Sequence, residues 1–199
     1  MIEITFTERT KASLRESLLD SAANLLAEHG FGGLRMADVA AVAGVSRQTV
    51  YNEFGNKATL VEAVTLRTTS EFLDGINQRL EAAVDLLSGI HAAVVYTIEH
   101  ARENRLVASA LGTQTGEDLL PLLTTRGEPV LSAATEMAAM HYLRRAPGLT
   151  PHTAALLAET VVRLALSHLV LRTHSAVEAA DMICAAVAPF LAHHSSTME

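Results

Sequence analysis

Apolar residues recur every three or four positions along almost the whole chain, and no stretch alternates residue by residue as a strand would. A first helix is predicted from about residue 11 to residue 29, because one stripe along it is apolar: Leu14, Leu18, Ala22, Leu25 and Leu26. Gly30 is expected to end this helix, since glycine adopts the left-handed C-terminal conformation without steric cost. The pattern therefore predicts an all-α protein.

Two short helices are predicted next, over about residues 36–43 and 47–53, with Gly44 in the turn between them. Ser46 is placed to cap the second of them through its hydroxyl, and Asn56 to cap a long fourth helix that runs to about Arg79. Two short helices joined by a glycine-containing turn, with small residues where they cross, form a helix-turn-helix. A generic glycine turn of this kind is more often an ordinary helical hairpin, so the motif alone does not decide the function.

The exposed face of the third predicted helix favours DNA over the hairpin interpretation. Arg47, Gln48, Thr49, Tyr51 and Asn52 are hydrogen-bonding residues without the usual Lys/Glu pairing of a solvated helix. Arginine and the amides can read guanine and adenine edges in the major groove. Tyr51 and a nearby lysine, Lys57, are expected nearer the sugar-phosphate backbone, where they position the protein.

The remaining chain predicts further helices near residues 76–103, 105–112, 117–123, 128–145, 151–172 and 175–194. Glycine and proline mark most of the breaks between them. Pro151 suits an early helical position, where its missing N–H is not needed.

The overall charge at first argues against nucleic acid, because 22 Asp+Glu outweigh 15 Lys+Arg for a net charge of −7. The charge is unevenly distributed, however. Residues 1–67 carry seven basic and eight acidic side chains, a net of −1, and the remainder carries eight and fourteen, a net of −6. A near-neutral N-terminal module joined to an acidic helical body is compatible with DNA binding.

Residues 10–60 resemble the DNA-binding domain of the TetR family of bacterial repressors. The resemblance runs through many positions at fixed spacing: Ala23, Leu26, Gly30, Phe31, Met36, Asp38, Val39, Ala40, Ala43, Gly44, Val45, Ser46, Thr49, Val50, Tyr51, Phe54, Lys57 and Leu60. It implies a three-helix helix-turn-helix domain, expected over residues 1–55, and a larger helical ligand-binding and dimerisation domain over residues 56–199. It also implies a homodimer on a palindromic double-stranded DNA operator.

Two positions depart from the family pattern. Arg35 stands where the family usually has a Ser or Thr that caps the second helix, and arginine cannot accept an N–H bond, although its charge could contact phosphate. Glu53 would repel phosphate, so it is expected to face away from DNA. The predicted DNA-binding residues are Arg35, Ser46, Arg47, Gln48, Thr49, Tyr51, Asn52 and Lys57.

The last two predicted helices are apolar on more than one stripe, which requires burial on two sides. They are either core helices of a large monomer or, as the family implies, part of a four-helix dimer interface, which we favour. The predicted interface residues are Val161, Leu164, Leu169, Ile183, Val187 and Phe190.

A ligand pocket is expected among the middle helices, with candidate residues Val94, Val95, Ile98, Arg102, Leu106, Leu111, Leu119, Leu123, Met137, His141, Leu164 and His168. Each apolar member taken singly is more often plain core than pocket lining. The region is rich in aliphatic residues, which suits a small hydrophobic, lipid-like or fatty-acid-like ligand. Arg102, His141 and His168 are polar groups that could hold a carboxylate, although an exposed or satisfied role is the commoner one for a histidine.

No sequence motif indicates an enzyme, a metal or another cofactor. The chain contains no His-Glu-x-x-His, no Gly-x-Ser-x-Gly and no phosphate-binding Gly-x-x-x-x-Gly-Lys, and its only cysteine, Cys184, lies in an apolar helix. Residues 153–171 are apolar but interrupted by Glu159, Arg163 and His168, which argues against a membrane span. The sequence therefore predicts a cytoplasmic, ligand-responsive transcriptional regulator, most simply a repressor. The alternative is a helical small-molecule carrier or interaction module that does not bind DNA.

Overall fold

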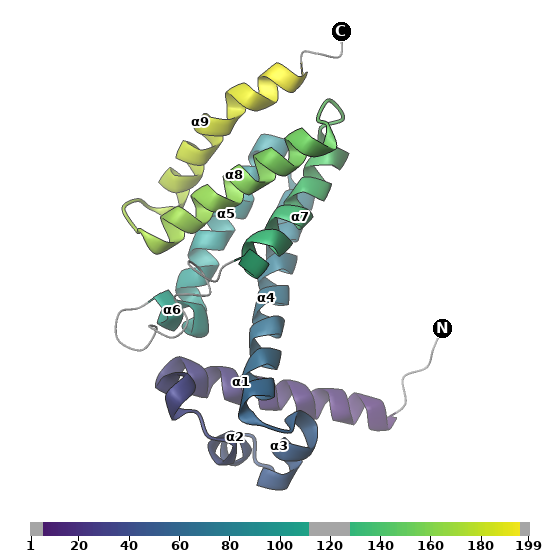
Figure 1. Cartoon of the computed structure of the whole chain (residues 1–199), viewed down its shortest axis with the longest axis vertical. Coiled ribbons are helices and arrows are strands. Elements are labelled where there is room, and N and C mark those ends of the chain that lie inside the picture. The colour runs from purple at the N-terminus through teal and green to yellow at the C-terminus, as the bar shows by residue number, and fades with distance from the viewer. Residues whose placement is uncertain (1–5, 112–127, 196–199) are drawn as a thin grey trace. The chain divides into compact units, whose positions relative to one another are not determined.

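The computed structural model (Figure 1) describes residues 6–111 and 128–195, and every regular element in these ranges is an α-helix. This confirms the predicted all-α class. The helices are α1 (Phe6–Gly33), α2 (Met36–Val42), α3 (Arg47–Phe54), α4 (Lys57–Ala82), α5 (Leu86–Glu103), α6 (Arg105–Leu111), α7 (Glu128–Arg145), α8 (Pro151–Val170) and α9 (Ala176–Ser195).

The predicted helix boundaries of the N-terminal part are close to the observed ones. Gly30 has φ 65° and ψ −179°, so the regular helix is interrupted there, and a further turn brings α1 to Gly33. Ser46 caps α3, its Oγ accepting the N–H of Thr49 at 3.1 Å. Asn56 caps α4 in the same way, with the N–H of Thr59 at 3.0 Å from its Oδ1.

One prediction for the middle of the chain is wrong. The single helix expected over residues 76–103 is two helices, because α4 ends at Ala82 and α5 begins at Leu86. The carboxylate of Asp85 accepts the N–H of Ser88 at 2.8 Å and caps α5, which requires an extended residue between the two helices. The helix predicted over residues 117–123 lies outside the described residues.

The described helices group into two compact units. The first contains α1, α2, α3, α4 as far as Thr69, and α6; the second contains α4 from Ser70, together with α5, α7, α8 and α9. This corrects the boundary expected after residue 55. Leu60 and Val64 of α4 are fully buried in the core of the first unit, so the first turns of α4 belong to that unit.

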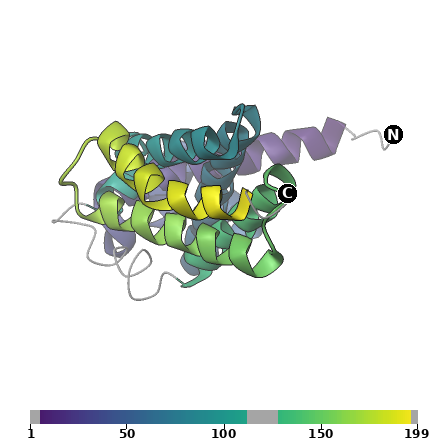
Figure 2. The ribbon, with the colours of Figure 1, turned by 90° about the horizontal axis from the view of Figure 1, so that it is seen from above.

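The core of the second unit lies between α5, α7, α8 and α9. Helix α7 packs along α8, α5 packs against α9, and α8 and α9 lie side by side (Figures 1 and 2). Alanines at the crossing points, among them Ala154, Ala158 and Ala180, are fully buried and allow the helices to approach closely. Ile90, Ile98 and related aliphatic side chains fill the space between them.

An aromatic cluster joins α4 to α5 within the second unit. The rings of Tyr96 and His100 stack with centroids 4.9 Å apart, and Phe72 contacts both. The guanidinium of Arg79 lies 4.1 Å from the centroid of the Tyr96 ring. The Tyr96 hydroxyl rests directly on Gly75 of α4, because a Cβ placed on that glycine would lie 2.0 Å from it.

Helices α8 and α9 are long and apolar enough to cross a membrane by length and composition alone, each with a mean hydropathy of 1.4. Their inward stripes nevertheless belong to the core of the second unit, where Leu157, Val161, Ile183 and Val187 are buried. Apolarity on several sides is thus partly explained by packing within one chain.

Candidate nucleic-acid interface

Helix α3 presents a polar face because its two large apolar residues point inward. Val50 and Phe54, four residues apart, are 0% and 4% exposed and anchor the helix in the core of the first unit. This orientation leaves Arg47, Gln48 and Asn52 exposed on the opposite side. The local amphipathicity of eight residues therefore fixes which side chains can meet a ligand.

Two i,i+4 pairs order this polar face. Gln48 Nε2 donates a hydrogen bond to Asn52 Oδ1 at 2.8 Å, and Arg47 Nη2 donates to the Tyr51 hydroxyl at 3.2 Å. The guanidinium of Arg47 lies 5.3 Å from the Tyr51 ring centroid, and its hydrogen bond to Tyr51 raises the pKa of Arg47. The Gln48 carbonyl oxygen and an Asn52 N–H remain directed to solvent, an acceptor and a donor that suit a base edge.

Ser46 and Thr49 are brought together at the start of α3, with their hydroxyl oxygens 2.8 Å apart. Because the Ser46 oxygen also caps the helix, its first role is to hold the N-terminus of α3. Thr49 is half-buried behind it.

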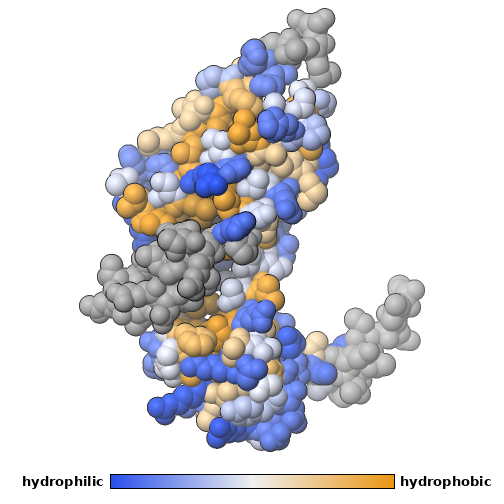
Figure 3. Space-filling model, in the orientation of Figure 1, coloured by the Kyte–Doolittle hydropathy of each residue, from blue (hydrophilic) through white to orange (hydrophobic). Residues whose placement is uncertain are grey.

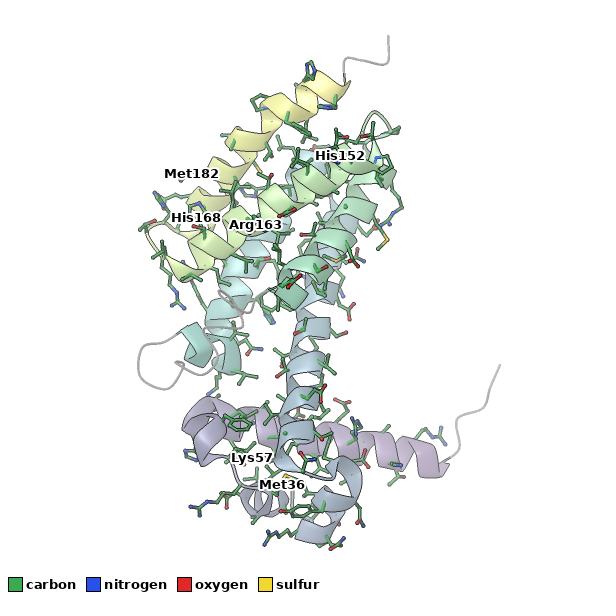
Figure 4. All side chains as sticks on the ribbon, in the orientation of Figure 1. Met36, Lys57, His152, Arg163, His168 and Met182 are labelled. Carbon is green, nitrogen blue, oxygen red and sulfur yellow. The ribbon has the colours of Figure 1, made fainter. Side chains whose placement is uncertain are left out.

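Lys57 lies at the beginning of α4, as Figure 4 shows together with Met36 of the neighbouring α2. Its Nζ is 4.5 Å from the centroid of the Phe31 ring and 3.4 Å from the Gly32 carbonyl oxygen. Phe31 remains 42% exposed, which is unusual for a phenylalanine and places its ring beside the lysine charge. The resemblance flagged Phe31 by position; its contact with Lys57 comes from the structure.

Arg35 is the residue before α2 and has an extended backbone, with φ −127° and ψ 137°. Its side chain makes no cap hydrogen bond, as expected for a side chain without an acceptor. Arg35 is exposed, so its charge is available near the first turn of α2.

The acidic side chain of α3 is neutralised within the first unit. Arg15 of α1 bonds to Glu53 at 2.7 Å, and its guanidinium lies 4.7 Å from the Phe54 ring centroid. Glu53 is therefore held against α1, in agreement with its expected orientation away from a bound anion. Sequence reasoning missed Arg15, because its partner lies 38 residues further along the chain.

Other carboxylates of the first unit are also paired. Arg67 of α4 contacts Glu16 at 3.0 Å and Asp20 at 2.8 Å on α1, and Arg105 of α6 contacts Glu28 at 3.0 Å. These contacts leave Arg35, Arg47 and Lys57 as cations without a carboxylate partner among the described residues. A near-neutral unit can thus present a positive face.

The predicted ligand residues divide between the two units. Val94, Ile98 and His141 are buried in the second unit, and four others are half-buried there: Val95, Met137, Leu164 and His168. Arg102 is exposed and donates to the His174 carbonyl oxygen at 3.4 Å. Leu106 is a correction, since it packs against the core of the first unit on α6. The side chains of Leu111, Leu119 and Leu123 lie outside the described residues.

The predicted dimer residues also need correction. Val161, Leu169, Ile183 and Val187 are at most 5% exposed within one chain, so they have almost no surface left for a second copy to cover. Leu164 and Phe190 remain half-buried. The same two helices instead expose Leu156, Val177 and Met182, and Leu171 follows α8.

No group of three or more His, Cys, Asp or Glu side chains that could hold a metal ion occurs in residues 6–111 and 128–195 whose side chains are described. Cys184 is buried, and burial raises the pKa of its thiol, which keeps it in the protonated, unreactive form.

Two family models match the chain. Residues 18–64 match bacterial regulatory proteins of the tetR family, and residues 85–189 match the C-terminal domain of bacterial tetracyclin repressors. The first match covers α2 and α3 with the adjoining parts of α1 and α4. The second match spans more than half of the 199 residues.

Similar proteins extend the match over nearly the whole chain. The HTH-type transcriptional regulator AlkX of Mycobacterium tuberculosis is 31% identical over 196 residues, which cover 96% of this chain and 91% of that protein. The crystal structure of the TetR family repressor AlkX from Dietzia sp., implicated in biodegradation of n-alkanes, superposes with a TM-score of 0.67 at 24% identity, over 90% and 95% of the two chains. FadR from Bacillus subtilis in complex with stearoyl-CoA gives 0.59 at 13% identity, over 85% and 95%.

Proposed function

The chain belongs to the tetR family of bacterial regulatory proteins, and from this premise we propose that it is a ligand-responsive repressor that binds a palindromic operator as a homodimer. Members of this family are DNA-binding regulators. The observation that carries the proposal is the polar face of α3, on which Arg47, Gln48 and Asn52 are exposed and ordered by i,i+4 hydrogen bonds.

In the proposed complex, α3 lies in the major groove. Arg47, Gln48 and Asn52 read base edges, while Tyr51 and Lys57 contact the sugar-phosphate backbone. Arg35 adds a phosphate contact at the start of α2. The backbone N–H groups in the first turn of α4 favour a further phosphate there, since the N-terminus of a helix attracts anions.

The proposed dimer uses the outward faces of α8 and α9. Figure 3 shows hydrophobic side chains gathered over these helices in the second unit, and the exposed apolar residues include Leu156, Val177 and Met182. Met182, Arg163 and His168 are labelled on these helices in Figure 4. A contiguous apolar surface is best covered by a second copy, which gives the two-fold symmetry that a palindrome requires. Coverage by protein, together with the ionisable Arg163 and His168, supports a cytoplasmic protein over one that inserts α8 and α9 into lipid.

The proposed effector is a small hydrophobic molecule that binds the second unit. The core there is aliphatic, and two fold neighbours concern such compounds: FadR from Bacillus subtilis was solved with stearoyl-CoA, and AlkX from Dietzia sp. is implicated in n-alkane biodegradation. Helix α4 belongs to both units, so a change in its direction would alter the separation of the two reading heads. The effector shifts this equilibrium only if it binds the non-operator arrangement more tightly.

Selection from a pool of random duplexes tests the DNA-binding part of the proposal. The full chain is expected to enrich a palindromic sequence, to bind it as a dimer and to lose affinity steeply as salt rises. Arg47→Ala should reduce the enrichment. The matched surface variant Arg163→Ala, which removes an arginine paired with Glu159 in the second unit, should leave it intact.

The rival interpretation, a helical carrier that does not bind DNA, makes the opposite prediction. It requires that no sequence be enriched at any salt concentration, and that Arg47→Ala and Arg163→Ala behave alike. That result would remove the regulator proposal for this chain.

A further inference from the structure

His141 is the most deeply buried ionisable side chain described in the second unit, with 1% of its surface exposed. It lies on α7, and its Nδ1 is 3.2 Å from Oε1 of Glu81, in the last turn of α4. The same carboxylate oxygen accepts a hydrogen bond from Arg144 Nη2 at 2.6 Å. The three side chains thus form a chain of polar contacts that ends inside the helical bundle.

The partners of His141 determine its tautomer. Hydrogen bonds from Arg144 and then from His141 lower the pKa of Glu81, which is therefore a carboxylate that can only accept. The hydrogen of His141 must then be on Nδ1. Arg144 already balances the charge of Glu81, so a second cation buried beside them would be uncompensated, and His141 is neutral.

A neutral histidine with its hydrogen on Nδ1 has an unshared electron pair on Nε2. This nitrogen is buried and has no hydrogen-bond partner among the described residues. The Thr135 hydroxyl, six residues earlier on α7, is also buried without one. Ala134 and Ala138 are on the His141 side of α7, seven and three residues before it, and their side chains are small and buried.

The chemistry of Nε2 selects the group that can satisfy it. A carboxylate and a thioester offer only acceptors, and a hydrocarbon offers neither, so none of them can bond to a buried electron pair. A hydroxyl group donates a hydrogen and carries no charge. We propose that the effector of this protein is a long-chain alcohol whose hydroxyl donates a hydrogen bond to Nε2 of His141. This inference rests on the proposed function, because it names the polar end of the hydrophobic effector.

Calorimetric titration of the full-length protein with three matched ten-carbon compounds tests the donor requirement. Decan-1-ol carries the O–H donor, 1-methoxydecane keeps the oxygen but lacks the donor, and decanoate has only acceptors. We expect decan-1-ol to bind about threefold to tenfold more tightly than 1-methoxydecane, as a net hydrogen bond contributes about that much. Decanoate should bind more weakly than the alcohol.

Two variants separate the acceptor from the packing of the ring. His141→Gln places an amide oxygen near the position of Nε2, whereas His141→Asn retains a donor toward Glu81 and has no acceptor there. The preference for decan-1-ol over 1-methoxydecane should survive in part in His141→Gln and disappear in His141→Asn. Operator binding without ligand should be the same in both variants, which shows that they fold.

A measurement on the unaltered protein keeps the test independent of folding. In ¹⁵N spectra of the histidine side chains, the Nε2 signal of His141 should move on addition of decan-1-ol and stay in place with 1-methoxydecane. Equal affinity for the alcohol and the ether, or a preference for decanoate, would overturn the inference while the DNA-binding result still stood. The same holds if a long-lived water is found on Nε2 and remains there when the alcohol binds. If none of the three compounds binds, the hydrophobic effector and the inference fail together.

Discussion

The contact between Gly75 and Tyr96 predicts the effect of adding one methyl group to α4. Alanine is the better helix former by about 1 kcal/mol in a helix interior, so Gly75→Ala would stabilise the protein if nothing opposed it. The structure places the Tyr96 hydroxyl 2.0 Å and the ring carbon Cζ 2.3 Å from the new Cβ. Tyr96 must therefore leave its position against α4.

The loss can be estimated from the contacts that Tyr96 makes. Its ring lies 4.1 Å from the Arg79 guanidinium, 4.9 Å from the His100 ring and 5.9 Å from the Phe72 ring. A half-exposed cation–π contact contributes about 0.5–1 kcal/mol and an aromatic pair about 0.5–1.5 kcal/mol. Losing these contacts costs about 2–3 kcal/mol, so after the helix-propensity gain Gly75→Ala should destabilise the protein by about 1–2 kcal/mol.

The sign of this effect should reverse when Tyr96 is removed. In a Tyr96→Ala background, Gly75→Ala meets no ring and should stabilise by up to about 1 kcal/mol, a coupling of about 2–3 kcal/mol between the two positions. Gly89→Ala is the matched control on α5. A Cβ there meets nothing closer than 3.4 Å, so the variant should be neutral or stabilising.

Thermal unfolding followed by circular dichroism at one protein concentration measures all four variants. For a chain of this length, 1 kcal/mol corresponds to a shift of about 2–4 °C. A Gly75→Ala variant at least as stable as the unaltered protein would refute the reasoning. So would an equal effect of Gly75→Ala in the presence and absence of the Tyr96 ring, because the loss would then not arise from this contact.

Three further predictions concern DNA, assembly and pH. Lys57→Ala should weaken binding to all duplexes by a similar factor, whereas Gln48→Ala should relax preference at one base position by about 1–3 kcal/mol; uniform weakening by Gln48→Ala in a binding selection would contradict its base-reading role. Met182→Glu, at a 49% exposed site, should dissociate the dimer in sedimentation experiments without loss of helical content, and an unchanged dimer would remove Met182 from the interface. Backbone and side-chain hydrogen bonds from Ser88 and Ser175 lower the pKa values of Asp85 and Glu178, so their stabilising effect should be present above the ordinary carboxyl pKa of about 4 and be lost as pH falls below it. The unfolding temperatures of Asp85→Asn and the unaltered protein should accordingly converge in acid, and a constant difference down to pH 2 would exclude this cause.

Local features of the fold were predictable because they depend on neighbouring residues. The caps by Ser46 and Asn56 each involve an N–H three residues away, and the polar face of α3 follows from the buried Val50 and Phe54. The break at Asp85 had the same kind of signal in the Ser88 cap. It was missed because the apolar pattern continues across it without a glycine or proline.

Non-local features could not be read from the pattern. A helix that is apolar on several sides does not reveal which stripe faces its own chain, and this is why Val161 and Ile183 were assigned to the dimer surface instead of the core. Leu106 looked like part of the middle-helix core because its neighbours in sequence lie there. Its packing against α1 depends on a change of unit at residue 105, which no local signal marks.

Helix α6 has a consequence for recombining this protein with its relatives. Because α6 packs on α1 and Arg105 bonds to Glu28, the first unit is assembled from two separate stretches of sequence. A hybrid regulator joined at a single crossover point after residue 55 or within α4 would leave α6 behind and uncover the face of α1 that receives Leu106. Exchange of reading heads between such proteins therefore calls for two crossovers, one in α4 and one at the start of α6.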